Sequence, residues 1–357
     1  MNFKLSVYLD SDAVGCLTSQ HFVTEWDNLL RATPSSTVCQ SAKFALTWWS
    51  VYGSVCRIAI ACCRDATGLL IGYYGMAKQG DRNWGPIGLH QCEYPAVLAY
   101  GDDPKIVCAI LRALHRTLKF RRLQFIFLPP GSPVDGYAGA ALAADVRECP
   151  LPYRAFADID PPSKRTKQKI ARLKKLGART EVVDFAKSCD EFLPKFISIH
   201  EARQKAKGYT APFEADPLKS RYLVALARDA HLLHVAAIWI DQRLVAATIC
   251  LRDRSRIVVG MLAHDEEFES LSPAAVLVHE LGALCANSEI RAIDLTPGGA
   301  YKERFATGTE MAFSAELTWS IGGAVRMLIR RLARYGLGQI RSFRAKISPA
   351  STAKSPM

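Results

Sequence analysis

The stretch "HLLHVAAIWIDQRLVAATICLRDRSRIVVGMLAHD" (residues 231–265) decides the fold of this chain. It holds three apolar runs that are joined by the short polar turns "DQR" and "RDRS". Runs of this length bounded by turn residues predict strands, and such short connections predict antiparallel hairpins. A helix is expected next over 272–288 and then a strand over 291–297. Three strands, a helix and a further strand indicate an α/β domain with a mixed sheet.

The rest of the chain alternates between helical and strand patterns in the same way. Helices are predicted over 19–32, 41–53, 103–120, 163–177, 188–208 and 216–230, and strands over 55–63, 69–76, 123–130, 153–160, 180–185 and 310–320. Two α/β halves of like order predict a duplicated domain. We therefore expect an N-terminal domain over 1–158, a C-terminal domain over 159–320, and a basic amphipathic helical tail over 321–357 with a disordered end.

The composition is that of a globular protein, with 357 residues, 49% apolar and 22% charged. The eleven cysteines are irregularly spaced and form no CxxC motif, which predicts free thiols in a reducing compartment. No apolar run approaches the roughly 20 residues that span a bilayer, and the first residues lack the pattern of a signal peptide. We expect a cytoplasmic protein that is soluble or peripheral on the inner face of the cell membrane.

Two segments account for much of the net charge of +12. Eight Lys or Arg residues and no acid lie between Asp160 and Glu181, around an apolar stripe that includes Leu173. This run holds no aromatic residue for stacking bases, so it predicts a solvated helix face rather than a nucleic-acid site. After Glu316 come eight more cations and no acid. There an apolar stripe (Val325, Leu328, Ile329, Leu332) flanked by arginines is typical of a helix on an anionic membrane; the alternative is a helix docked with its arginines outward.

Local sequence adds a family resemblance. The segment "EWDNLLRATPSSTVCQSAKFALTWWSVYG" (25–53) resembles the opening of the cellulose-biosynthesis-associated, CelD-like acyltransferases. The features that match are Trp26, Leu29, Pro34, Ser36, Gln40, Trp48 and Trp49. Further matches are Leu176-Gly177, then His200, Arg203 and Gly208, then "LSPA" (271–274) and "DLTPGGAYKERF" (294–305). Ala274 departs from the family's usual glycine, and the glycine-rich phosphate loop of ordinary Gcn5-related N-acetyltransferases (GNAT enzymes) is absent.

The resemblance implies a tandem duplicated GNAT fold, with a mixed, mostly antiparallel sheet flanked by helices in each half. It implies an N-acyltransferase that moves an acyl group from acyl-CoA, as co-substrate, to a primary amine, with no permanently bound cofactor. The basic tail favours a lipid-like long-chain amine as acceptor, as in amide-forming sphingolipid or ceramide-type synthesis. An amino sugar of an exopolysaccharide is the other acceptor that we consider.

Two other functions fit the same sequence. One is a Fem-like transferase that uses aminoacyl-tRNA to modify a cell-wall precursor, which would give the basic helix an RNA to hold. The other is a non-catalytic member of the family, for which Ala274 is the best support.

The candidate site residues fall into three groups. Donor binding is expected from a helix start and a glycine pair: Ser272, Pro273, Ala274, Gly298 and Gly299. The catalytic group comprises an orienting carboxylate, a proton donor, a cation and a strand-end base: Asp294, Tyr301, Lys302 and His264. Acceptor binding is expected from a helix end and loop: His200, Arg203, Lys207 and Tyr209. An ordinary helix cap, a polar turn and a solvated helix end are the non-functional alternatives. No spacing of metal ligands occurs, so no metal is expected.

Overall fold

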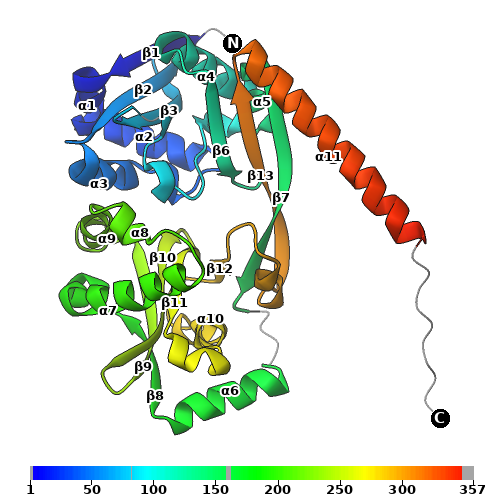
Figure 1. Cartoon of the computed structure of the whole chain (residues 1–357). Coiled ribbons are helices and arrows are strands. Elements are labelled where there is room, and N and C mark those ends of the chain that lie inside the picture. The colour runs from blue at the N-terminus through cyan, green and yellow to red at the C-terminus, as the bar shows by residue number, and fades with distance from the viewer. Residues whose placement is uncertain (1–2, 82, 158–161, 348–357) are drawn as a thin grey trace.

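The structure, a computed structural model, describes residues 3–81, 83–157 and 162–347 (Figure 1). The chain forms two α/β halves, one above the other in Figure 1, and a long helix that leaves the body. This is the mixed α/β architecture, with antiparallel-rich sheets and two halves, that the sequence predicts. The disordered end predicted over 348–357 lies outside the described residues.

The first half is built on a small antiparallel sheet. Its strands are β1 (Phe3–Leu9), β2 (Cys56–Asp65), β3 (Leu70–Gln79) and β4 (Gly85–Pro86), and β5 (Leu98–Ala99) also pairs with β3. Helices α1 (Asp10–Thr18), α2 (Gln20–Ala32) and α3 (Ala42–Tyr52) contribute to one hydrophobic core, and α4 (Pro104–Leu118) to another. Cys62 and Cys63 fall into these two different cores, as adjacent residues of a strand with two buried faces must. All eleven cysteines are free.

The second sheet has eight strands. Their order is β6 (Arg122–Leu128), β13 (Gly308–Thr318), β7 (Ala143–Ala155), β12 (Ala292–Asp294), β11 (Arg256–His264), β10 (Arg243–Asp253), β9 (Leu233–Ile240) and β8 (Ala178–Val183). Within the described strands, only β11 and β12 pair in parallel. Helices α7 (Phe185–Ala206) and α9 (Lys219–Arg228) pack into one core of this sheet, and α6 (Lys164–Lys175) and α10 (Pro273–Leu284) into the other. Short helices α5 (Val134–Ala140) and α8 (Pro212–Ala215) complete the two halves.

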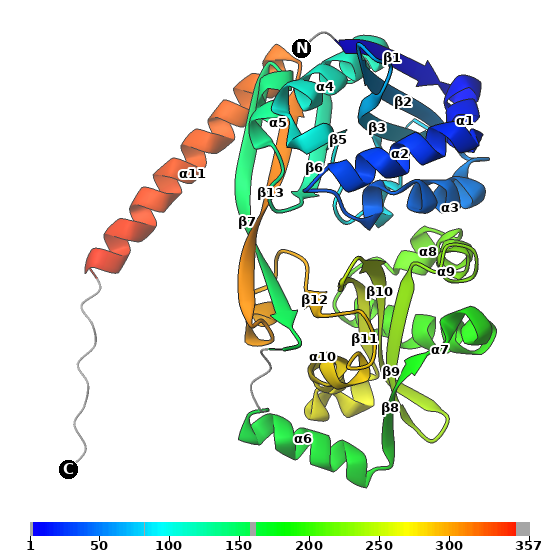
Figure 2. The ribbon, with the colours of Figure 1, turned by 180° about the vertical axis from the view of Figure 1, so that it is seen from behind.

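Strands β7 and β13 join the halves, as both views in Figures 1 and 2 show. They pair along their whole length, from Ala143 with Thr318 to Tyr153 with Gly308. At one end β13 also pairs with β6 of the first half, and at the other end β7 pairs with β12 of the second. The last strand in the sequence therefore lies in the eight-stranded sheet between β6 and β7, two strands that come from the first part of the chain. The domain division at residue 158 stays a prediction.

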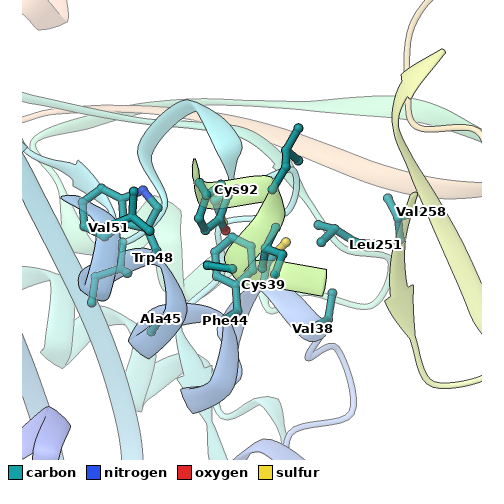
Figure 3. Packing of buried hydrophobic residues seen from close by; sticks show 14 of the residues in the cluster. Val38, Cys39, Phe44, Ala45, Trp48, Val51, Cys92, Leu251 and Val258 are labelled. Carbon is teal, nitrogen blue, oxygen red and sulfur yellow. The ribbon is translucent and has the colours of Figure 1, made fainter. Parts of the chain in front are cut away.

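The two halves also share a hydrophobic core (Figure 3). Val38, Phe44 and Trp48 of the first half belong to the same buried cluster as Leu251 and Val258 of the second. Hydrogen bonds cross the same boundary: the Tyr52 hydroxyl donates to Asp216 Oδ2 (2.7 Å), the Val38 N–H to Asp253 Oδ1 (3.1 Å), and Arg254 Nη2 to Ser36 Oγ (2.8 Å). The two halves therefore pack through both apolar contacts and specific hydrogen bonds, and a site can be built from residues of both.

The predicted helices and strands mostly form where expected, and the helix over 163–177 begins with Ser163 accepting a hydrogen bond from the Thr166 N–H. Two predictions were wrong in extent, and some elements were not predicted at all. The strand predicted over 153–160 is β7, which starts at Ala143; its first residues show no apolar run because pairing with β13 rather than burial holds them. Helix α9 starts at Lys219, after Asp216 has accepted the Leu218 N–H. Strand β1 and helix α1 were not predicted.

Candidate functional site

The central feature of the second half is a split between two parallel strands. Strands β11 and β12 pair only from Arg256 with Ala292 to Val258 with Asp294. Strand β11 then continues to His264 while still paired with β10, whereas β12 ends at Asp294. Beyond Val258, the edge of β11 that faces away from β10 has no strand partner within the described residues. This leaves backbone donors and acceptors available to an extended ligand.

A β-bulge lies just past the point of divergence. Ile249 of β10 pairs with Met261, and the next residue, Cys250, pairs with Val259, so Gly260 is the extra residue. A bulge frees a backbone group from the ladder, and bulges are over-represented beside active sites. A Cβ atom at position 260 would lie 3.3 Å from the Ile249 carbonyl oxygen, a tight contact that glycine avoids.

A cavity of about 70 Å³, partly open to solvent, lies against this bulge and between the two halves of the chain. Strand residues on its wall include Ile249, Gly260 and Met261. The remaining lining comes from the segment 90–93 of the first half and from helix α9, with Leu223 and Leu226 among the apolar residues. The wall is thus largely apolar, and Glu93 and Lys219 are its charged groups besides His90.

Four buried or half-buried charged groups meet around Glu93. Burial raises the pKa of Glu93 to about 7, with Lys302 and Lys219 opposing the rise and Asp294 adding to it. Burial likewise lowers the pKa of Lys219 and of Lys302, and Glu93 partly offsets both shifts. Burial raises the pKa of Asp294 to about 6, against hydrogen bonds from the Thr296 N–H and from Tyr94. Carboxyl groups with pKa values this close to neutrality can accept and return protons near pH 7.

Asp294 is 5% exposed and is held from both halves. The Tyr94 hydroxyl lies 2.8 and 3.0 Å from its two carboxylate oxygens, and the Thr296 N–H donates to Oδ1 at 2.7 Å. Lys302 Nζ donates to Thr296 Oγ1 (2.7 Å) and to the Thr296 carbonyl oxygen (3.1 Å). The turn after β12 therefore binds the ammonium group beside the carboxylates.

The turn also contains the expected glycine pair. Gly298 and Gly299 have φ angles of 85° and 81°, a left-handed region that favours glycine. Both are exposed, so their backbone is accessible. Tyr301 follows with a side chain that is 52% exposed and that no described group holds in place. Of the expected catalytic residues, Asp294 and Lys302 are brought together, and Tyr301 lies on the same turn.

His264 belongs to a neighbouring group rather than to this one. Burial, together with a smaller contribution from the positive charge of Arg203, lowers the pKa of both His264 and His200 to about 4. Arg203 Nη1 also donates to the Leu262 carbonyl oxygen of β11 (3.4 Å), and Lys207 acts on His264. Three of the expected acceptor residues therefore meet His264 at one end of β11. Tyr209 is 64% exposed.

Lys219 connects the two groups, because it also lowers the pKa of His200. His200 itself lies 5.5 Å, ring to ring, from Phe196, and the Nδ1 atoms of His200 and His264 are buried without a hydrogen-bond partner in the described residues. Both histidines are thus neutral at pH 7.

The start of α10 differs from the expectation of a capped helix. Ser272 has a φ of 48°, and its hydroxyl does not cap the helix but accepts a hydrogen bond from Lys169 of α6 at 2.5 Å. Arg165 and Arg304 both act on Lys169, so three cations gather there. The preceding turn carries the acids Asp265, Glu266, Glu267 and Glu269. Pro273 and Ala274 are buried, so their side chains pack rather than face a ligand.

Sequence reasoning missed Glu93, Tyr94, Lys219 and Gly260. The first two lie in an irregular segment of the first half, and only the packing of the halves brings them to Asp294. The single glycine in the strand "RIVVGMLAHD" was the one signal available in the sequence. An isolated glycine within a strand often marks a bulge.

Comparisons with known proteins bear on the domain and the fold. Residues 163–305 match the family described as "Acetyltransferase (GNAT) domain". The fold of nearly the whole chain also recurs in solved structures. The C-terminal domain of a putative lysylphosphatidylglycerol synthetase from Agrobacterium fabrum is similar with 12% identity and a TM-score of 0.56, over 86% of this chain and 94% of that one.

Two further structures have the same fold. FemX is similar with 10% identity and a TM-score of 0.55, over 82% of this chain and 95% of that one. L-PGS from Bacillus licheniformis is similar with 11% identity and a TM-score of 0.54, over 87% and 96%. No curated protein matches the sequence. Residues 163–305 of the second half thus match a GNAT-type acetyltransferase domain, whereas the specific resemblance to CelD-like proteins has no counterpart among these matches. Among the described residues, no helix is both long and apolar enough to cross a bilayer.

Proposed function

We propose that this protein is an N-acyltransferase that moves an acyl group from acyl-CoA to a primary amine. The observation that carries the proposal is Glu93, which lines a cavity beside Lys219 and the Gly260 bulge and has a pKa of about 7 that the charges of Lys302 and Lys219 hold down against burial. Acyl transfer to an amine needs a base near neutral pH, aligned reactants and donors for an oxyanion.

The open edge of β11 supports an extended donor. The pantetheine arm of CoA carries amides that can pair with a free strand edge, as an added strand does. The thioester would then lie near the bulge, where a freed backbone N–H can donate to the developing oxyanion. Lys169, Arg165 and Arg304 at the start of α10 provide positive charge for the donor's phosphates, which supports donor binding there by the basic side chains and not by a serine cap.

The reaction would proceed by attack of the amine nitrogen on the thioester carbonyl carbon. The C–N bond forms and the C–S bond breaks, while Glu93 takes the proton that the amine loses. Lys302 offsets the negative charge of the oxyanion, and Asp294, held by Tyr94, orients the amine or returns a proton. Tyr301 can protonate the leaving thiolate. His264 and His200 are less suited as bases, because a pKa of about 4 makes them weak proton acceptors.

The cavity supports a lipid-like long-chain amine as acceptor over an amino sugar. Its walls hold Leu223, Leu226 and Met261, and its charged groups are confined to the side of Glu93 and Lys219. An alkyl chain fits such a wall, whereas a sugar would leave several hydroxyl groups without partners. His200, Arg203, Lys207 and Tyr209 would then contact the polar part of the acceptor.

A Fem-like function is the second candidate. FemX and two proteins named as lysylphosphatidylglycerol synthetases share the fold over more than four fifths of this chain, across both halves. In that case aminoacyl-tRNA is the donor. The acids of the 265–269 turn would repel the phosphates of CoA, whereas the phosphates of a tRNA need not lie next to this turn. The exposed cations of α6 would contact the RNA.

The purified chain should be incubated with acyl-CoAs of two to sixteen carbons and with glucosamine or alkylamines of increasing length. Amide products should be followed by mass spectrometry, because the eleven free cysteines react with thiol reagents. We expect an amide with a long-chain amine. If only aminoacyl-tRNA yields product, the Fem-like function is correct, and if no combination does, a non-catalytic member of the family is the better interpretation.

A variant of Met261 tests whether the cavity binds the alkyl chain of the acceptor. Met261→Trp should fill the cavity and raise KM for long alkylamines by about tenfold or more while leaving short amines nearly unchanged, since about 1.4 kcal/mol is a tenfold change. Met311→Trp, at a 39% exposed position outside the cavity, is the matched control. Equal KM changes for long and short amines would rule out the cavity as the site of the chain.

A further inference from the structure

Helix α11 (Ile321–Ile347) leaves the body of the protein after β13. Figures 1 and 2 show it from opposite sides, and in both it extends away from the two halves. Its side chains are described as far as Arg334. The body of the protein covers only a small part of this helix. The remaining face of the helix therefore contacts either another molecule or water.

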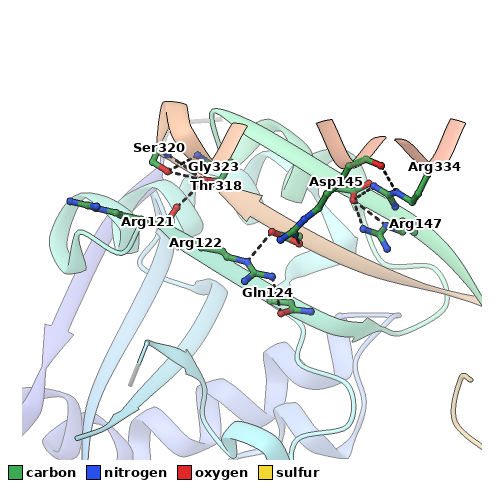
Figure 4. A network of polar contacts seen from close by, with 11 residues as sticks. Arg121, Arg122, Gln124, Asp145, Arg147, Thr318, Ser320, Gly323 and Arg334 are labelled. Carbon is green, nitrogen blue, oxygen red and sulfur yellow. Dashed lines mark hydrogen bonds and ion pairs between the residues drawn. The ribbon is translucent and has the colours of Figure 1, made fainter. Parts of the chain in front are cut away.

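The face that meets the body is small and cationic (Figure 4). Met327, 7% exposed, packs against the body. Arg334 Nη2 donates to Asp145 Oδ2 at 2.7 Å, and Arg330 lies 3.5 Å from Glu316. Near the start of the helix, the Gly323 N–H donates to Ser320 Oγ at 3.2 Å. Arginines thus turn toward the protein, which is the reverse of a helix docked by its apolar stripe, so the alternative of outward arginines over a docked stripe was wrong.

The apolar row faces the opposite way. Five side chains are exposed: Ile321 (77%), Val325 (49%), Leu328 (56%), Ile329 (59%) and Leu332 (62%). At about 100° per residue they fall within an arc of about 100° on the side opposite Met327. Soluble proteins rarely leave a contiguous apolar row of this kind in water unless it contacts a partner.

Two arginines flank this row. Arg326 and Arg331 each lie roughly 60° beyond one of its edges, by the same rotation per residue. Both are exposed, and neither forms an ion pair with the residues that the structure describes. Cations at both edges of an apolar face match a bilayer interface, where the apolar side chains reach the acyl boundary and the cations stay among the headgroups.

The charge distribution separates a membrane from a second copy of the chain. Eight Lys or Arg residues and no acid follow Glu316. Two such helices facing one another would repel, whereas an anionic lipid surface attracts each basic residue. We propose that α11 lies flat on an anionic bilayer, with the row from Ile321 to Leu332 inserted at the acyl boundary and with Arg326 and Arg331 at the lipid phosphates. This surface is independent of the reaction proposed above.

The test is co-sedimentation of the full-length chain with vesicles of phosphatidylcholine alone or with about a third phosphatidylglycerol, at low and high salt. We expect binding to the anionic vesicles that weakens as salt rises. The variant with Leu328→Asp and Leu332→Asp should bind at least tenfold more weakly. Ile126→Asp, a 53% exposed position on β6, is the control and should bind like the wild type. Thermal unfolding checks that all variants fold.

The charge is tested by Arg326→Glu with Arg331→Glu. This variant should lose the preference for anionic vesicles, since two cations at the headgroups become acids. Absence of wild-type binding, or unchanged binding of the Leu328/Leu332 variant, would overturn the proposal. So would light scattering that shows a dimer in the wild type and a monomer in the Leu328/Leu332 variant, because a second copy would then cover the row.

Discussion

The Tyr94 hydroxyl, from the first half of the chain, lies 2.8 Å from one carboxylate oxygen of Asp294 and 3.0 Å from the other. Asp294 ends β12 in the second half, at the point where β11 and β12 diverge. Burial raises the pKa of both groups, so each is protonated or hydrogen-bonded at neutral pH. The candidate site is therefore completed across the boundary between the halves, and neither half contains it alone.

Tyr94→Phe tests whether the Tyr94 hydroxyl stabilises the fold and whether it lowers the pKa of Asp294. The loss of the hydroxyl leaves a buried carboxyl with one partner fewer, so we expect about 1–3 kcal/mol less stability and a further rise in the pKa of Asp294. Urea unfolding and the pH dependence of the rate measure the two effects. Tyr100→Phe, at a 54% exposed position, is the control. An unchanged unfolding midpoint and pH profile in Tyr94→Phe would show that the contact is not formed in solution.

Glu93→Gln tests the base. If Glu93 accepts the amine proton, kcat should fall by about 10²–10⁴-fold, the usual contribution of a general base. The wild-type rate should rise with pH through about 7, as Glu93 loses its proton, and this rise should be absent in the variant. Glu148→Gln, an exposed position, should behave like the wild type. A rise near pH 7 that survives in Glu93→Gln would assign the base to another group.

Lys302→Ala tests the electrostatic role of the turn after β12. Its ammonium group binds Thr296 Oγ1 and the Thr296 carbonyl oxygen, so its loss should cost only about 1 kcal/mol of stability. If Lys302 offsets charge that grows in the transition state, kcat and kcat/KM should both fall by about 10²-fold. A rise in KM for the donor at constant kcat would indicate phosphate binding instead.

Two further variants test whether the turn after β12 takes part in catalysis. Tyr301→Phe should lower turnover far more than stability, since its side chain is 52% exposed. Glu303→Ala, an exposed neighbour on the same turn, should leave both unchanged. Wild-type kinetic constants in Lys302→Ala and Tyr301→Phe would remove this turn from the mechanism.

His264 should affect stability in acid. Its folded-state pKa, about 4, lies below the ordinary value of 6.5, so its contribution is complete above pH 6.5 and is lost as pH falls toward 4. In His264→Gln, the loss of unfolding free energy between pH 7.5 and 4.5 should be smaller by about 2–3 kcal/mol. Urea unfolding at both pH values measures it. His21→Gln, at an 84% exposed side chain, is the control and should lose as much unfolding free energy between the two pH values as the wild type. The same result in His264→Gln would show that the imidazole of His264 is solvated.

The sequence by itself determined the elements and their class. Apolar runs of strand length, separated by turns of a few polar residues, predict antiparallel hairpins for residues 231–265. Strands β9, β10 and β11 form there. Local chemistry also determined several boundaries, since Ser163 caps α6 and Asp103 caps α4 by hydrogen bonds to backbone N–H groups two or three residues on. Asp294 and Lys302 were singled out through the family resemblance of "DLTPGGAYKERF", and the structure has Asp294 at the end of β12 and Lys302 on the turn that follows.

Tertiary structure alone decided which groups meet those two. Glu93 and Tyr94 are 200 residues or so distant in sequence, in a segment without regular structure, and the shared core of the two halves brings them to Asp294. The insertion of β13 between β6 and β7 has the same origin, since strand pairing over such separations leaves no local pattern. The outward direction of the apolar row on α11 was also beyond the sequence: periodicity defines a stripe on a helix, but only the contacts of Arg330, Arg334 and Met327 with the body decide which way it faces.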